Sequence, residues 1–164
     1  MRSEGDRLLE ALDELTRIAR EANVHAEIYH LKAAGQQNWP KMREAIAKIE
    51  AARKQGLRIS ANMYPYIAGA TGLDAAMPPW VQAGGTEAWI ERLQDPEIRA
   101  RVLREMRTPS EEWESLYLAA GSPDKIMLIG FKNDKLKPLT GQTLAQVAKA
   151  RGGTPEEAAI DLVI

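Results

Sequence analysis

Apolar residues recur at helical spacing from the start of the chain. The inward positions of a first predicted helix are Leu8, Leu12, Leu15, Ile18 and Ala22. Ser3-Glu4-Gly5-Asp6 precedes them with the spacing of a capping-box variant. A second stripe follows Pro40, and its members are Met42, Ala45, Ile46 and Ile49. Asn38 can cap this second amphipathic helix and Gly56 can end it.

Short segments rich in β-branched and aromatic residues follow each of these helices. Residues 24–30 and 57–64 are predicted to be strands. Residues 125–131 form the most nearly continuous apolar run and predict a third, buried strand. Helices that alternate with strands through short connections are typical of a parallel sheet. The pattern therefore predicts an α/β fold.

The stretch of residues 67–123 interrupts this alternation. Glycine and proline punctuate its first part as in a loop, at Gly69, Gly72, Pro78-Pro79 and Gly84-Gly85. Thr86 and Asp95-Pro96 then predict the starts of two helices that reach Met106. We interpret residues 1–164 as a single segment in which 67–123 is a loop and helix insertion between strands.

Two more helices are predicted near the carboxyl end. One carries Leu144, Val147 and Ala148 and ends at Gly152-Gly153. Thr154-Pro155-Glu156-Glu157 starts the other, with a capping residue, proline at the first helical position and acidic residues in the first turn. The chain ends soon afterwards on the apolar Leu162-Val163-Ile164. We therefore expect it to be a piece of a longer protein, with a docked terminal helix as the alternative.

Charge and composition narrow the classes of partner. The net charge is -1, from 22 Lys plus Arg against 23 Asp plus Glu, so no overall field attracts nucleic acid or anionic lipid. No apolar run has the length of a membrane span, and the amino terminus lacks the apolar stretch of a signal peptide. With no Cys in the chain, thiolate metal sites and thiol nucleophiles are excluded within it. We expect a cytoplasmic protein that acts on a small molecule.

Chemically useful side chains follow the first two predicted strands. His30 and Lys32 share a strand face, as do Asn62, Tyr64 and Tyr66. The carboxyl ends of parallel strands are where α/β proteins build their sites, so these side chains are predicted to line one pocket. An imidazole can bind Zn²⁺ or move a proton, a lysine can pair with a carboxylate, and a tyrosine hydroxyl can polarise a carbonyl. A structural histidine, a solvated lysine and packing tyrosine rings are the alternatives.

Four blocks of sequence give the chain a family resemblance. They are Met1-Arg2-Ser3-Glu4-Gly5, Tyr29-His30-Leu31-Lys32-Ala33-Ala34-Gly35, Tyr64-Pro65-Tyr66-Ile67-Ala68-Gly69 and Leu136-Lys137-Pro138-Leu139-Thr140-Gly141. In this order and rough spacing the chain resembles the middle portion of the N-acyl-D-amino-acid deacylases, or D-aminoacylases, of the amidohydrolase superfamily. The resemblance implies a partial zinc-bearing (β/α)₈ barrel of about three parallel strands, with the insertion between the second and third.

The resemblance also implies roles for individual residues. His30 matches a metal-binding histidine, Lys32 matches a lysine that pairs with the substrate carboxylate, and Tyr64 matches a tyrosine that contacts the substrate. The implied activity is zinc-assisted hydrolysis of the amide bond of N-acyl-D-amino acids, in which the metal activates water. Asn62 departs from the pattern, because relatives commonly carry Asp there.

The remaining metal ligands and the catalytic aspartate of the family have no counterpart in this sequence. A catalytic zinc needs about three protein ligands. We therefore assign no catalytic residue and expect the chain alone to be catalytically incomplete, with zinc belonging to the full-length parent. Three strands from a closed barrel would also leave unpaired edges, which predicts self-association. Two alternatives stay open: a non-catalytic carboxylate-binding or assembly domain, and a hydantoinase-like or dihydroorotase-like cyclic amidase.

Overall fold

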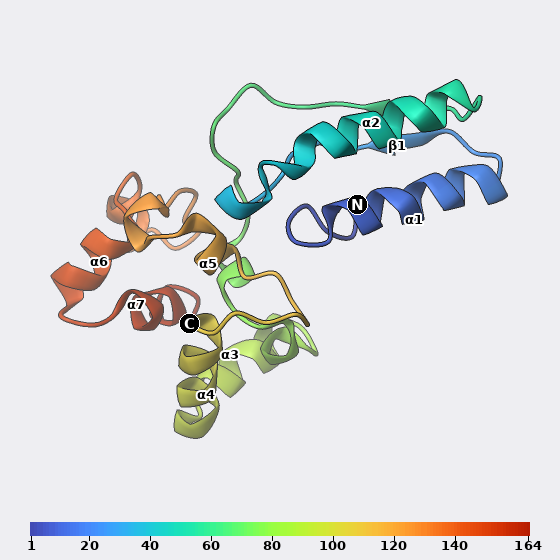
Figure 1. Cartoon of the computed structure of the whole chain (residues 1–164). Helices are drawn as coiled ribbons and strands as arrows, with labels where there is room; N and C mark the ends of the chain where they lie inside the picture. Colours follow the sequence, from blue (N-terminus) through green and yellow to red (C-terminus); the bar gives the residue numbers. More distant parts are fainter. The chain divides into compact units, whose positions relative to one another are not determined.

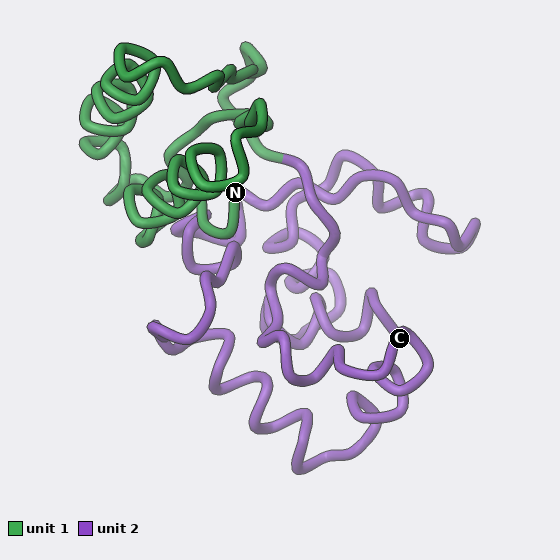
Figure 2. The backbone as a smooth tube through the Cα atoms, turned by 90° about the vertical axis from the view of Figure 1, so that its right-hand side faces the viewer, with its two compact units in different colours: residues 1–69 green, residues 70–164 purple.

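A computed structural model describes all residues, 1–164, and divides them into two compact units. Unit 1 is Met1–Gly69 and unit 2 is Ala70–Ile164 (Figure 2). Each unit has its own cluster of buried apolar side chains.

Unit 1 consists of two helices and a two-stranded parallel sheet. Its elements are α1 (Leu8–Glu21), β1 (Ala26–Ile28), a 3₁₀ turn (Gln36–Asn38), α2 (Lys41–Lys54) and β2 (Ile59–Ala61) (Figure 1). The register pairs Ala26 with Ile59 and Ile28 with Ala61. The α/β order and the parallel pairing that the sequence predicted are confirmed, although both strands are shorter than expected.

The core of unit 1 lies where the two helices pack on the sheet. Its buried members are Leu8, Leu12, Ala19, Ile28, Ala45, Ile49, Ala52 and Ile59. Three residues expected in this core are instead exposed: Ile18 at 52%, Ile46 at 45%, and Ala22 at the end of α1. The buried residues of these two helices include the small Ala19, Ala45 and Ala52.

Unit 2 is built from short helices around a second core. Its elements are 3₁₀ turns at Leu73–Ala76, Pro79–Gln82, Pro123–Lys125 and Lys137–Leu139, and the helices α3 (Thr86–Gln94), α4 (Pro96–Met106), α5 (Leu116–Ala120), α6 (Leu144–Arg151) and α7 (Pro155–Asp161). The predicted starts of α3, α4 and α7 are confirmed. Thr154 forms a full capping box with Glu157, and Thr143 forms one with Gln146.

The third strand expected at residues 125–131 is not formed. Only one antiparallel bridge, between Met127 and Thr143, occurs there. Leu128 is buried, whereas Met127 and Ile129 are each 62% exposed. This segment has no neighbouring strand in unit 2, so its apolar residues cannot pair on both edges as a buried strand requires. The structure contains two strands, and neither a third nor a barrel segment is seen directly.

None of the helices has both the length and the apolar character needed to cross a membrane.

Candidate functional site

The backbone brings the ends of the two strands together as the sequence predicted. Beyond the strands themselves, the N–H of Asn62 donates to the carbonyl of Ile28 at 3.1 Å, and the N–H of Leu31 donates to the carbonyl of Asn62 at 2.8 Å. The parallel pairing therefore continues to the residues that follow both strands. It places His30 and Tyr64 at the same edge of the sheet.

The backbone of His30 has an unusual conformation. Its φ is 40°, in the left-handed region that residues with a side chain rarely adopt. The N–H of His30 donates to the side-chain oxygen of Asn62 at 2.7 Å, which holds this turn in place. Asn62 thus positions the imidazole from the neighbouring strand end.

His30 and Lys32 meet a carboxylate that sequence reasoning did not assign to the site, that of Glu4. The Nδ1 of His30 lies 2.9 Å from Glu4 Oε1, and Lys32 Nζ lies 2.5 Å from Glu4 Oε2. Lys32 Nζ also lies 2.7 Å from His30 Nδ1. All three side chains are half-buried, with 25% to 33% of each exposed. An imidazole, an ammonium and a carboxylate therefore share one small polar cluster.

Glu4 reaches this cluster because the amino-terminal segment is tied to the loop after β1. The carbonyl of Glu4 accepts from the N–H of Ala34 at 2.7 Å. Asn38 is 2% exposed and donates to Asp6 at 2.9 Å and to the carbonyl of Ala34 at 2.8 Å, so it clamps this segment rather than capping α2. In the sequence, Glu4 is part of the capping-box pattern at the start of the first helix. That pattern gives no indication that Glu4 contacts His30 and Lys32.

Aromatic rings surround the imidazole. The ring of Tyr29 lies 4.1 Å from that of His30, and the ring of Tyr64 lies 6.1 Å from it, centroid to centroid. Lys32 Nζ lies 5.7 Å from the centroid of Tyr64, close enough for a cation–π attraction. The rings of Tyr64 and Tyr66 are 6.4 Å apart. The structure thus brings together His30, Lys32 and Tyr64, the site residues that the sequence predicted.

A second row of polar contacts supports the site from the sheet. The amide of Asn62 donates to Glu27 Oε1 at 2.9 Å, and the hydroxyl of Ser60 donates to the other oxygen of Glu27. The Ser60 bond is the main reason that the pKa of Glu27 lies below its ordinary value. His25 Nε2 lies 2.7 Å from the hydroxyl of Ser60 and so belongs to the same row of contacts. Because Asn62 donates to a carboxylate, Asp at this position would face Glu27 with like charge.

The chain by itself does not fit a metal ion. No group of three or more His, Cys, Asp or Glu side chains is arranged to hold one. His30 and Glu4 supply two such side chains, and Glu4 is already paired with Lys32. About three protein ligands are needed for a catalytic zinc. What this cluster offers chemically is an ammonium and phenol groups for an anionic ligand, beside one imidazole.

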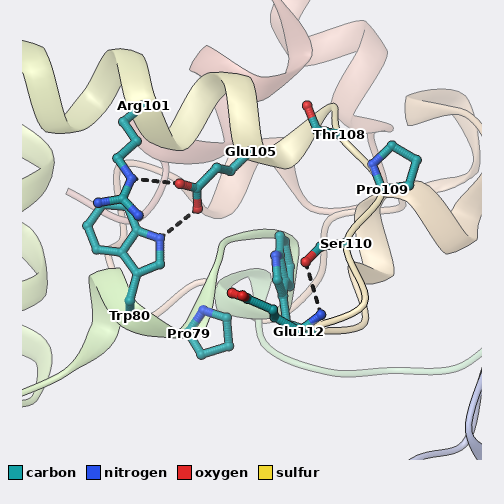
Figure 3. Close-up of a pocket in the computed structure, with 9 residues that line it drawn as sticks. Pro79, Trp80, Arg101, Glu105, Thr108, Pro109, Ser110 and Glu112 are labelled. Atoms are coloured by element: carbon teal, nitrogen blue, oxygen red, sulfur yellow. Dashed lines mark hydrogen bonds and ion pairs between the residues drawn. The ribbon is translucent and has the colours of Figure 1, made fainter.

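Unit 2 contains a separate cavity of about 360 Å³ (Figure 3). Glu105 lies on its wall and accepts from the indole N–H of Trp80 and from Arg101 Nε, each at 2.6 Å. Burial would raise the pKa of Glu105, but these two bonds outweigh it and hold the pKa below its usual range. The Arg101 guanidinium lies over the Trp80 ring at 4.0 Å. These groups satisfy one another, and Pro79, Pro109 and Trp113 supply apolar walls.

Comparison with known proteins identifies what the chain resembles. It is 44% identical over 73 residues to a D-aminoacylase from Alcaligenes xylosoxydans xylosoxydans, a stretch that covers 44% of this chain and 15% of that enzyme. No family model matches the chain. The predicted resemblance to the N-acyl-D-amino-acid deacylases is confirmed by this match.

Solved structures agree with the sequence match. A D-aminoacylase described as defining a novel subset of amidohydrolases is 27% identical, with a TM-score of 0.61. An N-acyl-D-glutamate deacylase from Bordetella bronchiseptica is 23% identical, with a TM-score of 0.66. At this identity the match supports a similar fold and nothing more. That enzyme was solved with zinc and a phosphonate inhibitor that mimics the tetrahedral intermediate. Each match covers 99% of this chain and 25% of the other chain. The chain thus spans about a quarter of the length of these solved relatives.

Proposed function

Because the chain resembles the N-acyl-D-amino-acid deacylases of the amidohydrolase superfamily, we propose that it forms part of a hydrolase that cleaves the amide bond of N-acyl-D-amino acids. The observation that carries this proposal is the meeting of His30, Lys32 and Tyr64 at the carboxyl ends of β1 and β2. Active sites of α/β barrels are built at these strand ends. The activity belongs to the longer parent protein, because the chain covers only part of its relatives.

Lys32 and Tyr64 are proposed to bind the substrate. The Lys32 ammonium is a compact positive charge that can pair with the free carboxylate of an N-acyl amino acid. The Tyr64 hydroxyl makes no hydrogen bond within the chain and can donate to the same carboxylate or to the acyl oxygen. Together they would fix one end of the substrate near the imidazole.

His30 is proposed as one metal ligand of the parent enzyme. Its Nε2 makes no hydrogen bond within the chain, whereas Nδ1 faces Glu4 and Lys32. An imidazole held through one nitrogen and open at the other is a common arrangement for a ligand. The other ligands would have to come from outside these 164 residues, so no step of the chemistry is assigned to a metal on this chain.

The test is hydrolysis of N-acetyl-D-amino acids by the full-length parent with Lys32 altered. Lys32→Met should raise KM at least tenfold, since about 1.4 kcal/mol of carboxylate binding corresponds to a factor of ten. Lys48→Met is the matched control, because Lys48 also pairs with a carboxylate, that of Asp13 at 2.8 Å, away from the site. Equal kinetics for wild type and Lys32→Met would refute the assignment.

A non-catalytic carboxylate-binding domain is the second candidate. It is favoured by the lack of a third metal donor in the cluster. The zinc content of the purified chain after dialysis, measured per chain, separates the possibilities. We expect no stoichiometric zinc on the isolated chain and stoichiometric zinc on the parent. A parent without zinc and without hydrolysis would favour the binding domain.

A further inference from the structure

The cavity of unit 2 already holds one cation, which belongs to the chain itself. The guanidinium of Arg101 lies over the ring of Trp80, 4.0 Å from its centroid, and Arg101 Nε donates to Glu105 Oε1 at 2.6 Å (Figure 3). The other oxygen of Glu105 accepts from the indole N–H of Trp80 at 2.6 Å. An indole and a carboxylate thus bind a guanidinium on this wall of the cavity, and both oxygens of Glu105 are used.

Glu112 and Trp113 bring the same two kinds of group to this cavity without a partner. Both residues line it. The Glu112 carboxylate makes no hydrogen bond or ion pair within the chain, because only the backbone N–H of Glu112 is bonded, to the hydroxyl of Ser110 at 3.1 Å (Figure 3). The Trp113 indole makes no hydrogen bond and no ring or cation contact. This second carboxylate and indole are therefore open to a ligand.

Size and charge favour a small cation as the occupant. The volume of about 360 Å³ lies at the lower end of the range of small-molecule sites, roughly 300–1,000 Å³. The charged side chains that line the cavity are one arginine and two glutamates, so their charges sum to -1. A guanidinium is planar and always charged, binds a carboxylate through two parallel N–H groups, and stacks on aromatic rings. It therefore matches both open groups.

We propose that Glu112 and Trp113 form a binding site for the guanidinium group of a ligand, in the same cavity as the pair that holds Arg101. The Glu112 carboxylate accepts hydrogen bonds from the ligand, and the Trp113 ring attracts its positive charge. Pro79 and Pro109 supply apolar surface for the alkyl part of the ligand. The site lies wholly within unit 2 and shares no residue with the cluster at the strand ends of unit 1, so it is independent of the proposed amide hydrolysis.

Binding can be measured in the 164-residue chain through its indole groups. The chain has four tryptophans, so four indole N–H signals are expected in a ¹H–¹⁵N correlation spectrum. Methylguanidinium is the probe, and N-methylurea, which has the same planar shape without the charge, is the control. Methylguanidinium should shift the signals of Trp80 and Trp113 saturably and leave that of Trp39, in unit 1, unchanged. No saturable shift, or an equal shift with N-methylurea, would overturn the proposal, and this comparison needs no variant.

Two variants test the two groups separately, with the Trp80 signal as the readout. Glu112→Gln keeps the shape of the side chain but removes its charge, and Trp113→Leu removes the ring. Each should weaken methylguanidinium binding about two- to fivefold, as expected for an exposed ion pair or cation–π contact. Glu111→Gln is the matched control, because Glu111 is exposed but does not line the cavity, and it should leave the affinity unchanged. Trp113 packs against neither buried cluster, so Trp113→Leu should fold. An unchanged affinity in both test variants would overturn the proposal.

The guanidinium can belong to a free small molecule or to an arginine side chain of a peptide. N-acetylarginine N-methylamide presents the same group with a peptide bond on each side. If it binds more tightly than methylguanidinium, the site is assigned to a peptide arginine. Equal or weaker binding assigns the site to a free guanidinium compound. Failure of both probes to bind would refute the site.

Discussion

At the scale of single residues, Asn62 is the side chain on which the geometry of the site depends. It accepts from the N–H of His30 at 2.7 Å and donates to Glu27 at 2.9 Å. Asn62→Ala should release the left-handed turn at His30 by removing one hydrogen bond, worth about 1 kcal/mol. We expect the amide of His30 to exchange with solvent roughly five- to tenfold faster, which residue-resolved hydrogen exchange can measure.

The control for this prediction is Asn133→Ala in unit 2. Asn133 also accepts a backbone N–H through its side chain, that of Lys135 at 3.0 Å. Its loss should leave the exchange of His30 unchanged. An unchanged rate in Asn62→Ala itself would mean that packing of the neighbouring rings, and not this bond, holds the turn.

The residues of the site were predictable to the extent that strand geometry controls them. Parallel order brings the residues that follow β1 and those that follow β2, including Tyr64, to the same edge. The strand alternation that predicted a shared face for His30 and Lys32 does not apply, because β1 ends at Ile28 and His30 lies in a turn with positive φ. Glu4 was not predictable as a site residue. No sequence feature near it indicates that the amino-terminal segment packs against the loop after β1. The role of Asn62 was also not predictable, because it depends on the positive φ of His30, which follows the neighbouring strand.

At the scale of elements, a buried carboxylate joins three helices of unit 2. Glu156, in the first turn of α7, accepts from Arg107 Nη2 after α4 and from the Tyr117 hydroxyl of α5, both at 2.8 Å. The Arg107 bond is the main cause that lowers the pKa of Glu156 to about 2. Burial, followed by the bond to Glu156, raises the pKa of Tyr117.

A pH dependence of stability follows from this shift. The folded pKa of Glu156 lies below its unfolded value, so the contribution is complete above about pH 4.5 and is lost as the pH falls towards about 2. Since Arg107 is half exposed, we expect on the order of 2 kcal/mol for this contribution, less than the full shift would give. Urea unfolding of wild type and Glu156→Gln at pH 7 and pH 3 measures it. Their difference should shrink at the lower pH; a constant difference would contradict the assignment.

Helix starts in unit 2 were predictable because their signals are local. Thr154-Pro155 begins α7 and Asp95-Pro96 begins α4, where the Asp95 side chain accepts from the N–H groups of Glu97 and Ile98. A strand differs, because it needs a partner that its own sequence does not contain. The apolar run at 125–131 has strand character but pairs only with the short segment 141–144, where a single bridge joins Met127 to Thr143, so it stays irregular.

At the scale of the whole molecule, the small sheet of unit 1 is the element least able to be stable by itself. It has two strands of three residues each, so each strand has one edge without a partner strand. A two-stranded sheet is marginal by itself, and an open edge can pair with another chain. Met63, Tyr66 and Ile67, which follow β2, are 78%, 76% and 109% exposed. Unit 1 therefore has both open strand edges and an exposed apolar segment after β2.

We propose that copies of the chain associate through these features of unit 1, by pairing of strand edges or exchange of elements. Sedimentation velocity at increasing concentration should show a rising average mass. Ile67→Lys should reduce association, because it places charge on the exposed apolar segment that follows β2. Ile129→Lys makes the same change at a 62% exposed position of unit 2 and should have little effect. A monomer at every concentration would refute association, and equal effects of the two variants would place the contact elsewhere.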